Sequence, residues 1–115
     1  MTRGEVYWAT LMPRSGSEQQ GRWPVIVVSR DGFNKTPTWR SVIVVPISTS
    51  NAQGRRGPTA VLLPARSAGL KKTSIALCHQ VTTLDRGKTR EAHGMLALDL
   101  IQEIDSGIKA ALDLV

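Results

Sequence analysis

Apolar residues along the chain fall into a long series of short, strand-like runs, followed by one segment with helical spacing. The run Val-Ile-Val-Val occurs twice, at residues 25–28 and at 42–45. Four consecutive β-branched residues are typical of a strand that is buried on both faces. We therefore predict two central strands, at residues 24–29 and 41–47, with Pro24 at the entry of the first, where its missing N–H group is tolerated.

Shorter runs of strand-forming residues, bracketed by glycine and proline, predict further strands on either side of this pair. Residues 73–84 are compatible with two short strands, at 73–78 and 80–84, or with one long bent strand. The other strands are expected at residues 4–12, 59–63 and 91–95, and the connections at 33–40, 51–58, 65–72 and 85–88.

The spacing of apolar residues changes near the C-terminal end. They recur there at intervals of three and four, at Leu98, Ile101, Ile104, Ile108 and Leu112. This spacing indicates an amphipathic helix at residues 97–113, in which Gly107 is a weak position. Short strands and one terminal helix predict a mainly β fold, a small and strongly curved antiparallel barrel whose open face or end the helix covers.

Length and composition are those of a protein with one modest core. A chain of 115 residues, 41% of them hydrophobic, predicts a single globular domain over residues 1–115. No apolar run approaches the roughly 20 residues that span a bilayer, and the N-terminus lacks the apolar region of a signal peptide. Cys78 is the single cysteine, so no internal disulfide can form, and we expect a cytoplasmic protein without membrane association.

The charge of the chain is positive and unevenly distributed. The formal net charge is +6, and residues 98–115 carry −3, so the preceding 97 residues carry +9. A basic body of this kind favours a polyanionic partner, nucleic acid first, although a general solubility surface would have the same composition. In the predicted loops, we expect the pairs Arg55-Arg56 and Lys71-Lys72 to contact phosphates. Trp23 could stack on a base or be buried.

Motifs for metal or phosphate-loop chemistry are absent from the sequence. The chain has two histidines, His79 and His93, and no HExxH or CxxC motif, and its glycines fit neither the dinucleotide-binding nor the Walker pattern. We therefore expect no metal and no cofactor. What remains is metal-free acid–base chemistry, in which the 2′-hydroxyl of RNA attacks the adjacent phosphate with the help of a base, an acid and a cation.

A small set of side chains could supply these groups, and each also has a purely structural explanation. Glu18 could be a solvated loop charge, and Arg22 and Arg86 could be ordinary surface cations. Ser48 and Thr49 could cap the end of a strand through turn hydrogen bonds, and His79 could be a buried structural residue. The candidates are Glu18, Arg22, Ser48, Thr49, His79 and Arg86.

Segments along nearly the whole chain combine into a specific pattern. They read RGEVYW at 3–8, GSEQQG at 16–21, PVIVVS at 24–29, VPIST at 45–49 and ALCHQVTTLD at 76–85. Together they resemble the MazF/PemK (Kid) family of bacterial toxins. The resemblance implies an SH3-like barrel of five to seven antiparallel strands, a homodimer, and a neutralising antitoxin as partner in a type II toxin–antitoxin system. It also implies a sequence-specific endoribonuclease that cuts single-stranded RNA such as mRNA without a metal, leaving a 2′,3′-cyclic phosphate and a 5′-hydroxyl.

The family's site residues transfer only in part to this chain. Glu18 and Gln19 match the family loop, and Ser48, with Thr49 beside it, matches the hydroxyl residue after the Val-Pro motif. The family usually has an arginine directly before the proline of the second strand. This chain has Trp23 there and Arg22 one place earlier. Because a shift of one residue turns a strand side chain to the other face, Arg22 reaches the site only if the loop compensates.

His79 stands where Kid-like members have the aspartate of an Arg-Cys-Asp triplet, and Leu77 replaces the arginine. In the leading hypothesis Arg22 stabilises the phosphorane, Ser48 and Thr49 position the phosphate, and His79 and Glu18 act as acid–base groups. RNA would also contact Gln19, Trp23, Arg55, Arg56, Lys71, Lys72 and Arg86. Two alternatives stay open: a CcdB-like toxin that acts on DNA gyrase, and an RNA-binding module whose catalysis is weakened by the Arg22–Trp23 departure.

Overall fold

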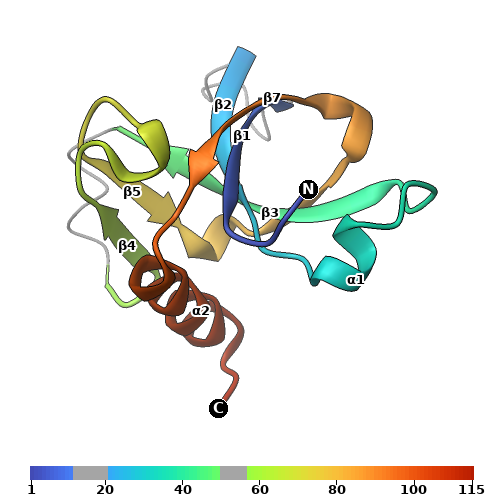
Figure 1. Ribbon diagram of the computed structural model, residues 1–115. Helices are drawn as coiled ribbons and strands as arrows, with labels where there is room; N and C mark the ends of the chain where they lie inside the picture. Colours follow the sequence, from blue (N-terminus) through green and yellow to red (C-terminus); the bar gives the residue numbers. More distant parts are fainter. Residues whose placement is uncertain (12–20, 50–56) are drawn as a thin grey trace.

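The computed structural model describes residues 1–11, 21–49 and 57–115. Within these ranges, strands make up most of the regular structure and a helix follows them at the C-terminal end (Figure 1). The strands are β1 (Glu5–Leu11), β2 (Gly21–Val27), β3 (Ser41–Ser48), β4 (Ala60–Leu63), β5 (Ser74–Leu77), β6 (Thr82–Asp85) and β7 (Thr89–Met95). The helices are α1 (Asp31–Asn34) and α2 (Leu98–Leu112), and the 3-10 segments are η2 (Ser67–Gly69), η3 (Cys78–Gln80) and η4 (Arg86–Lys88).

Strand β3 lies at the centre of an antiparallel sheet. The strand order is β4-β5-β3-β2-β1-β7, and β6 pairs with β3 outside this path. Val44 of β3 pairs with Val27 and also with Thr82, so β2 and β6 lie along opposite edges of β3. The predicted mainly β fold with a C-terminal helix is confirmed, as a curved antiparallel sheet whose end strands are β4 and β7 (Figure 1).

Strands β5 and β6 form one bent edge along β3. Ile47 of β3 pairs with Ala76 of β5, and Val44 pairs with Thr82 of β6. The turn η3 lies between them and is closed by a hydrogen bond from the Val81 N–H to the Cys78 carbonyl. The two arrangements predicted for residues 73–84 are thus both partly correct, because two short strands follow one edge with a 3-10 interruption.

The core is divided between two clusters of buried side chains. The larger cluster includes Val6, Ile26, Val45, Ile47 and Ile104. The smaller consists of Ala9, Val25, Val42 and Val44. Val25 and Ile26 are neighbours on β2, belong to different clusters and are at most 1% exposed. The prediction that this strand is buried on both faces is therefore confirmed.

Helix α2 covers the larger cluster and packs closely against η3 and β4. Gly107 is buried on the packed face of α2. A Cβ atom at this position would lie 2.7 Å from Sγ of Cys78 and 3.2 Å from Cγ2 of Val61. The missing side chain therefore allows the close approach of the helix. Among the described residues, no helix is long and apolar enough to cross a membrane.

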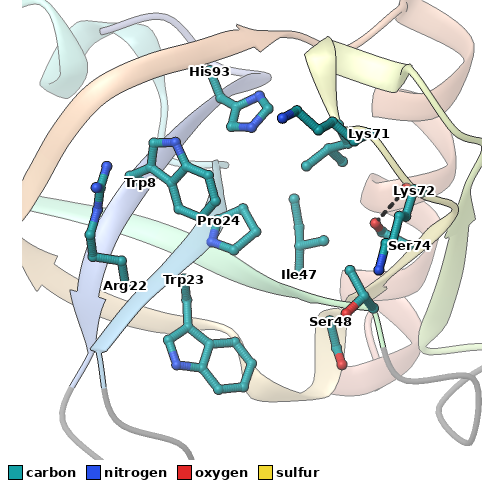
Figure 2. A pocket seen from close by; sticks show the side chains of 12 residues that line it. Trp8, Arg22, Trp23, Pro24, Ile47, Ser48, Lys71, Lys72, Ser74 and His93 are labelled. Carbon is teal, nitrogen blue, oxygen red and sulfur yellow. Dashed lines mark hydrogen bonds between the residues drawn. The ribbon is translucent and has the colours of Figure 1, made fainter.

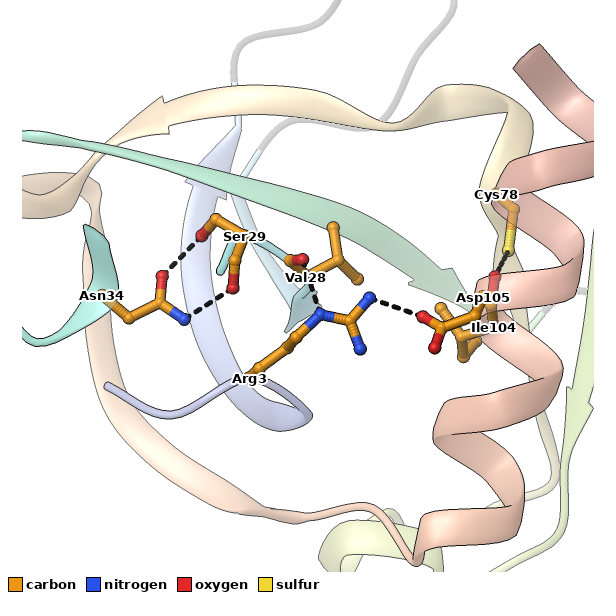
Figure 3. A network of polar contacts seen from close by, with 7 residues as sticks. All are labelled: Arg3, Val28, Ser29, Asn34, Cys78, Ile104 and Asp105. Atoms are coloured by element: carbon orange, nitrogen blue, oxygen red, sulfur yellow. Dashed lines mark hydrogen bonds and ion pairs between the residues drawn. The ribbon is translucent and has the colours of Figure 1, made fainter. Parts of the chain in front are cut away.

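Polar contacts join the N-terminal segment to α2 (Figure 3). Nε of Arg3 donates to the Val28 carbonyl at 3.0 Å, and Nη2 of Arg3 forms an ion pair with Asp105 of α2. Nearby, the Asn34 side-chain amide donates to the Ser29 carbonyl at 2.7 Å and accepts from the Ser29 hydroxyl. These contacts fix the end of β2 between the helix and α1.

Candidate functional site

A cavity of about 540 Å³ opens between β1, β2, the end of β3 and the connection from η2 to β5 (Figure 2). One part of its wall is apolar or aromatic: Trp8, Trp23, Pro24, Ile47 and Leu70. The other part carries cations, hydroxyls and an imidazole: Arg22, Ser48, Thr49, Lys71, Lys72, Ser74 and His93. An aromatic cavity rimmed by positive charge suits an anionic ligand that has flat rings.

The pairing of β1 with β2 places two of the wall residues opposite each other. Trp8 pairs with Pro24, and Thr10 pairs with Arg22. Side chains two residues apart on a strand share a face, so Arg22, Pro24 and Ile26 point to the same side of β2. The guanidinium carbon of Arg22 lies 5.1 Å from the centre of the Trp8 ring, in a cation–π contact. Arg22 is therefore among the residues that line the cavity, at the edge formed by Trp8.

The lysines at the rim follow a tight turn. Arg66 and Ala68 have left-handed φ angles of 77° and 48°, and Gly69 has one of 79°. The buried side chain of Leu70 then anchors the chain, and the exposed Lys71 and Lys72 follow it. The Ser74 hydroxyl donates to the Lys72 carbonyl at 2.9 Å. Both ammonium groups are thus displayed from a backbone that is fixed on either side.

His93 is a cavity residue that the sequence did not single out as a candidate. Its ring centre lies 5.1 Å from that of Trp8, at an angle of 53° between the planes. Its Nδ1 is 3.0 Å from the Ala68 carbonyl oxygen. The sequence did contain one signal for His93, which is its position directly before Gly94 on the predicted last strand. A glycine inside a strand often marks the close approach of a ligand or of another backbone.

The structure brings together half of the residues predicted for the site. Arg22, Trp23, Ser48, Thr49, Lys71 and Lys72 all line the cavity. Four others, Glu18, Gln19, Arg55 and Arg56, lie outside the described residues. The remaining two, His79 and Arg86, are placed elsewhere.

His79 is exposed and follows the buried Cys78 on η3, the turn that packs against α2. The sequence suggested a buried structural histidine as its alternative role, and its exposure contradicts that alternative. Nor is it among the residues that line the cavity. The turn of η3 ends the strand before this residue, which changes the direction of its side chain from the one an uninterrupted strand would give.

Arg86 is used to hold the backbone that follows α1. Its guanidinium donates to four carbonyl oxygens, at 2.8 Å to Asn34, 3.0 Å to Trp39, 3.1 Å to Phe33 and 3.3 Å to Thr36. A guanidinium has five N–H donors, so little of its capacity is left for a phosphate. The contacts favour a structural role for Arg86 over the predicted contact with RNA.

The thiol of Cys78 is unsuited to nucleophilic chemistry. Burial, together with the nearby Asp105 carboxylate, raises the pKa of this thiol to about 11. The thiolate is the reactive form of cysteine, and it is scarce at neutral pH with such a pKa. No group of three or more His, Cys, Asp or Glu residues that could hold a metal ion occurs in the part of the chain that the structure describes.

Comparisons with known proteins were consistent with one another. The family model described as PemK-like, MazF-like toxin of type II toxin-antitoxin system matches residues 2–112. Endoribonuclease MazF6 of Mycobacterium tuberculosis and Endoribonuclease MazF2 of Mycobacterium bovis are each 32% identical over 114 residues, which cover 99% of this chain and 98% of the relative.

Solved structures with the same fold include two from different sources. One is an endoribonuclease in complex with its cognate antitoxin from Mycobacterial species, with a TM-score of 0.80 and 23% identity over 100% of this chain and 97% of the other. Another is MazF from Deinococcus radiodurans, with a TM-score of 0.77 and 23% identity over 99% and 97% of the two chains. At this identity the structural similarity establishes the fold.

Proposed function

The chain belongs to the family of PemK-like, MazF-like toxins of type II toxin–antitoxin systems, and from this premise we propose that it is an endoribonuclease that cuts single-stranded RNA. Relatives that are 32% identical over almost their whole length are named endoribonucleases. One observation carries the proposal for this chain: a single cavity combines indole rings, cations and hydroxyls. Each of these groups has a role in binding or cutting RNA.

The shape and composition of the cavity favour a single strand over a duplex. Unstacked bases can enter a pocket and stack on aromatic rings, whereas bases in an A-form helix cannot be reached. Trp8 and Trp23 supply the ring surfaces, and each base stacked on an aromatic side chain contributes roughly 1–3 kcal/mol. Lys71 and Lys72 lie at the rim, where they would contact the backbone phosphates that flank the bound bases.

The proposed reaction is an internal transesterification without a metal. The 2′-oxygen bonds to the adjacent phosphorus, the bond from phosphorus to the 5′-oxygen breaks, and the products are a 2′,3′-cyclic phosphate and a 5′-hydroxyl. Arg22 would stabilise the charge of the phosphorane, since its guanidinium can form two parallel hydrogen bonds to phosphate oxygens. The hydroxyls of Ser48 and Thr49 would position the phosphate. Glu18 and Gln19 remain predicted contacts from outside the described residues.

Cleavage of a long, weakly structured RNA tests this proposal. We expect the protein to cut in the presence of EDTA and to leave cyclic phosphate and 5′-hydroxyl ends. Arg22→Gln should lower kcat/KM by roughly 10²–10³. Arg90→Gln removes the same charge from an exposed position of β7 outside the cavity lining, and it should leave cleavage unchanged. Loss of cleavage in EDTA, or 3′-hydroxyl products, would refute the mechanism.

The cognate antitoxin and a second copy of the chain are the proposed protein partners. A solved relative is an endoribonuclease in complex with its cognate antitoxin. Here we propose that an acidic antitoxin segment binds over the cationic rim and competes with RNA phosphates. For the homodimer, the support is exposed apolar surface near and on α2, with Met95 48%, Leu98 68% and Leu112 54% exposed. An affinity between toxin and antitoxin that does not change with salt would contradict the proposed electrostatic binding. A monomeric mass in light scattering would contradict the homodimer.

The two alternative functions make different predictions in the same assays. A gyrase-targeting toxin would stabilise gyrase–DNA cleavage complexes and leave RNA intact. An RNA-binding module would bind RNA without cutting it, and Trp23→Arg would then raise activity. The cationic lining of the cavity favours RNA over gyrase. The presence of Arg22 among the residues that line the cavity favours an active enzyme over a binding module.

A further inference from the structure

His93 has a position in the cavity that the mechanism above does not use. It lies on β7, directly before Gly94. A Cβ atom at Gly94 would lie 2.6 Å from the carbonyl carbon of Ala68, so the missing side chain allows η2 to lie flat against β7. This contact brings the Ala68 carbonyl to the imidazole, and Figure 2 shows Lys71 beside the imidazole. On the basis of the proposed function, we propose that His93 is the general base that accepts the 2′-hydroxyl proton.

The contact with Ala68 selects the tautomer that a base requires. The Nδ1 atom of His93 is 3.0 Å from the Ala68 carbonyl oxygen. A carbonyl oxygen can only accept, so the hydrogen bond forms when Nδ1 carries the proton. The neutral ring then has its lone pair on Nε2. A backbone carbonyl at one ring nitrogen, which fixes the tautomer and orients the ring, is how proteins prepare the other nitrogen for chemistry.

The turn before the lysines gives the carbonyl this direction. Ala68 and Gly69 both have left-handed backbone angles, and a Cβ at Gly69 would lie 2.9 Å from the carbonyl oxygen of His93. A non-glycine residue at φ 48° is uncommon, and such strain is concentrated at functional sites. The surrounding contacts hold it, including the hydrogen bond from Leu70 N–H to the Ser67 carbonyl at 2.8 Å.

Trp8 holds the proposed base and the phosphate-binding cation on one side chain. The ring of His93 and the guanidinium carbon of Arg22 each lie 5.1 Å from the Trp8 ring. Figure 2 shows the two groups on different sides of Trp8, with His93 at the cavity and Arg22 at its outer edge. The proposed base and the phosphorane-stabilising group both border the cavity in which the RNA would bind.

The proton balance of the step is simple. Nε2 takes the proton of the 2′-hydroxyl as the bond between the 2′-oxygen and phosphorus forms. The leaving 5′-oxygen takes a proton from water, and the imidazolium returns its own proton to the solvent. No oxidant, reductant or further reactant is needed, and the net reaction is a transesterification at phosphorus that divides the RNA chain in two.

Among the residues that the structure describes, the charged side chains that line the cavity with His93 are cationic. They are Arg22 of β2 and Lys71 and Lys72 after η2. On β1, Glu5 and Tyr7 contact each other through a hydrogen bond of 3.2 Å, and Tyr7 packs on the smaller core cluster of the opposite face. Arg90 and Glu91 of β7 itself are exposed. The base would therefore act beside the cations that bind the phosphate.

The test separates a catalytic imidazole from one that only holds the turn. In His93→Asn, the side-chain amide can still donate to the Ala68 carbonyl, but no proton acceptor replaces Nε2. We expect kcat/KM for RNA to fall by roughly 10²–10⁴, with the melting temperature almost unchanged. The fall in kcat/KM of the wild type at acid pH should disappear in this variant. In His93→Ala, added imidazole should restore part of the activity.

Each result decides the matter. If His93→Asn keeps wild-type cleavage and its acid limb, or if His79→Asn removes that limb, His93 is not the base while the proposed function stands. If imidazole restores nothing to a folded His93→Ala, the role of His93 is structural. If the wild type leaves RNA intact, the proposed function fails, and the assignment of His93 fails with it.

Discussion

The sharpest stability prediction concerns Gly107, where helix propensity and packing act in opposite directions. Alanine is favoured over glycine in a helix interior by about 1 kcal/mol, so Gly107→Ala would stabilise an unpacked helix. Here the added Cβ would lie 2.7 Å from Sγ of Cys78 and 3.2 Å from Cγ2 of Val61. Contacts under 3 Å require a neighbour to move, and Cys78 is fully buried. Overpacking of this kind costs about 1–3 kcal/mol.

We therefore expect Gly107→Ala to lower the free energy of unfolding by about 1 kcal/mol net. For a chain of this size, the melting temperature should fall by about 4 °C. Urea and thermal unfolding at neutral pH measure both quantities. Ser106→Ala, at the exposed neighbouring position of α2, is the matched control and should be neutral or stabilise by a few tenths of a kcal/mol, roughly the difference in helix propensity.

A double-mutant cycle identifies the atom responsible. Cys78→Ala removes Sγ, the nearest atom to the new methyl group. In that background Gly107→Ala should become neutral or stabilising, with a coupling free energy of about 1–2 kcal/mol. If Gly107→Ala raises the stability of the otherwise unchanged chain by the full propensity difference, α2 does not approach η3 as described, and the argument fails.

Three further predictions follow from single contacts. Arg86→Lys should lower the free energy of unfolding by about 1–2 kcal/mol, because lysine cannot bind several carbonyls at once. The affinity for RNA should stay unchanged. A loss of affinity at constant stability would instead indicate that Arg86 contacts RNA. In the folded protein, Cys78 should react with a thiol reagent at least about 100-fold more slowly than in denaturant, because burial raises the pKa of its thiol to about 11. Equal rates in the two conditions would place the thiol at the surface. Hydrogen bonds from the Arg3 N–H and from Asn34 lower the pKa of Asp31 in the folded protein. The charged carboxylate therefore stabilises the fold above the ordinary pKa of 3.8, and this contribution is lost as the pH falls through the lower pKa of the folded state. In urea unfolding across this range, the free energy of unfolding of Asp31→Asn should depend less on pH than that of the wild type.

The strands were predictable because burial on both faces leaves a direct trace in the sequence. The two Val-Ile-Val-Val runs overlap β2 and β3, and neighbours on each strand, Val25 and Ile26 or Val44 and Val45, belong to different core clusters. The helix at Asp31–Asn34 was not predicted, and residues from 33 onward were expected to form a loop. Four residues are too short for a periodic pattern. Contacts from distant parts of the chain hold α1 in place, namely the Arg3 N–H on Asp31 and Arg86 on the Phe33 and Asn34 carbonyls.

The site was predictable in its charges and hydroxyls, and less so in its histidine. The lysines and hydroxyls that the sequence singled out, after a glycine-containing turn and after Val-Pro, line the cavity. The sequence favoured His79 because it stands at a family position on a predicted strand. The 3-10 turn η3 ends that strand, and the cavity contains His93 instead. The contact of His93 with the Ala68 carbonyl depends on the close approach of η2 to β7. Gly69 and Gly94 allow this approach, but the sequence alone does not show that these two glycines meet the opposite backbone.

The dipeptide Arg22-Trp23 can now be interpreted through strand register. On β2, Arg22 pairs with Thr10 and Trp23 pairs with Ala9 of β1, and neighbouring side chains of a strand point to opposite faces. The two side chains therefore enter the cavity from different directions, Arg22 across Trp8 and Trp23 beside Ser48 (Figure 2). In the family pattern one arginine precedes the proline. In this chain the cation contacts Trp8, and an indole stands directly before the proline. The phosphate under attack should accordingly bind on the Trp8 side, and a base of the RNA should stack on Trp23.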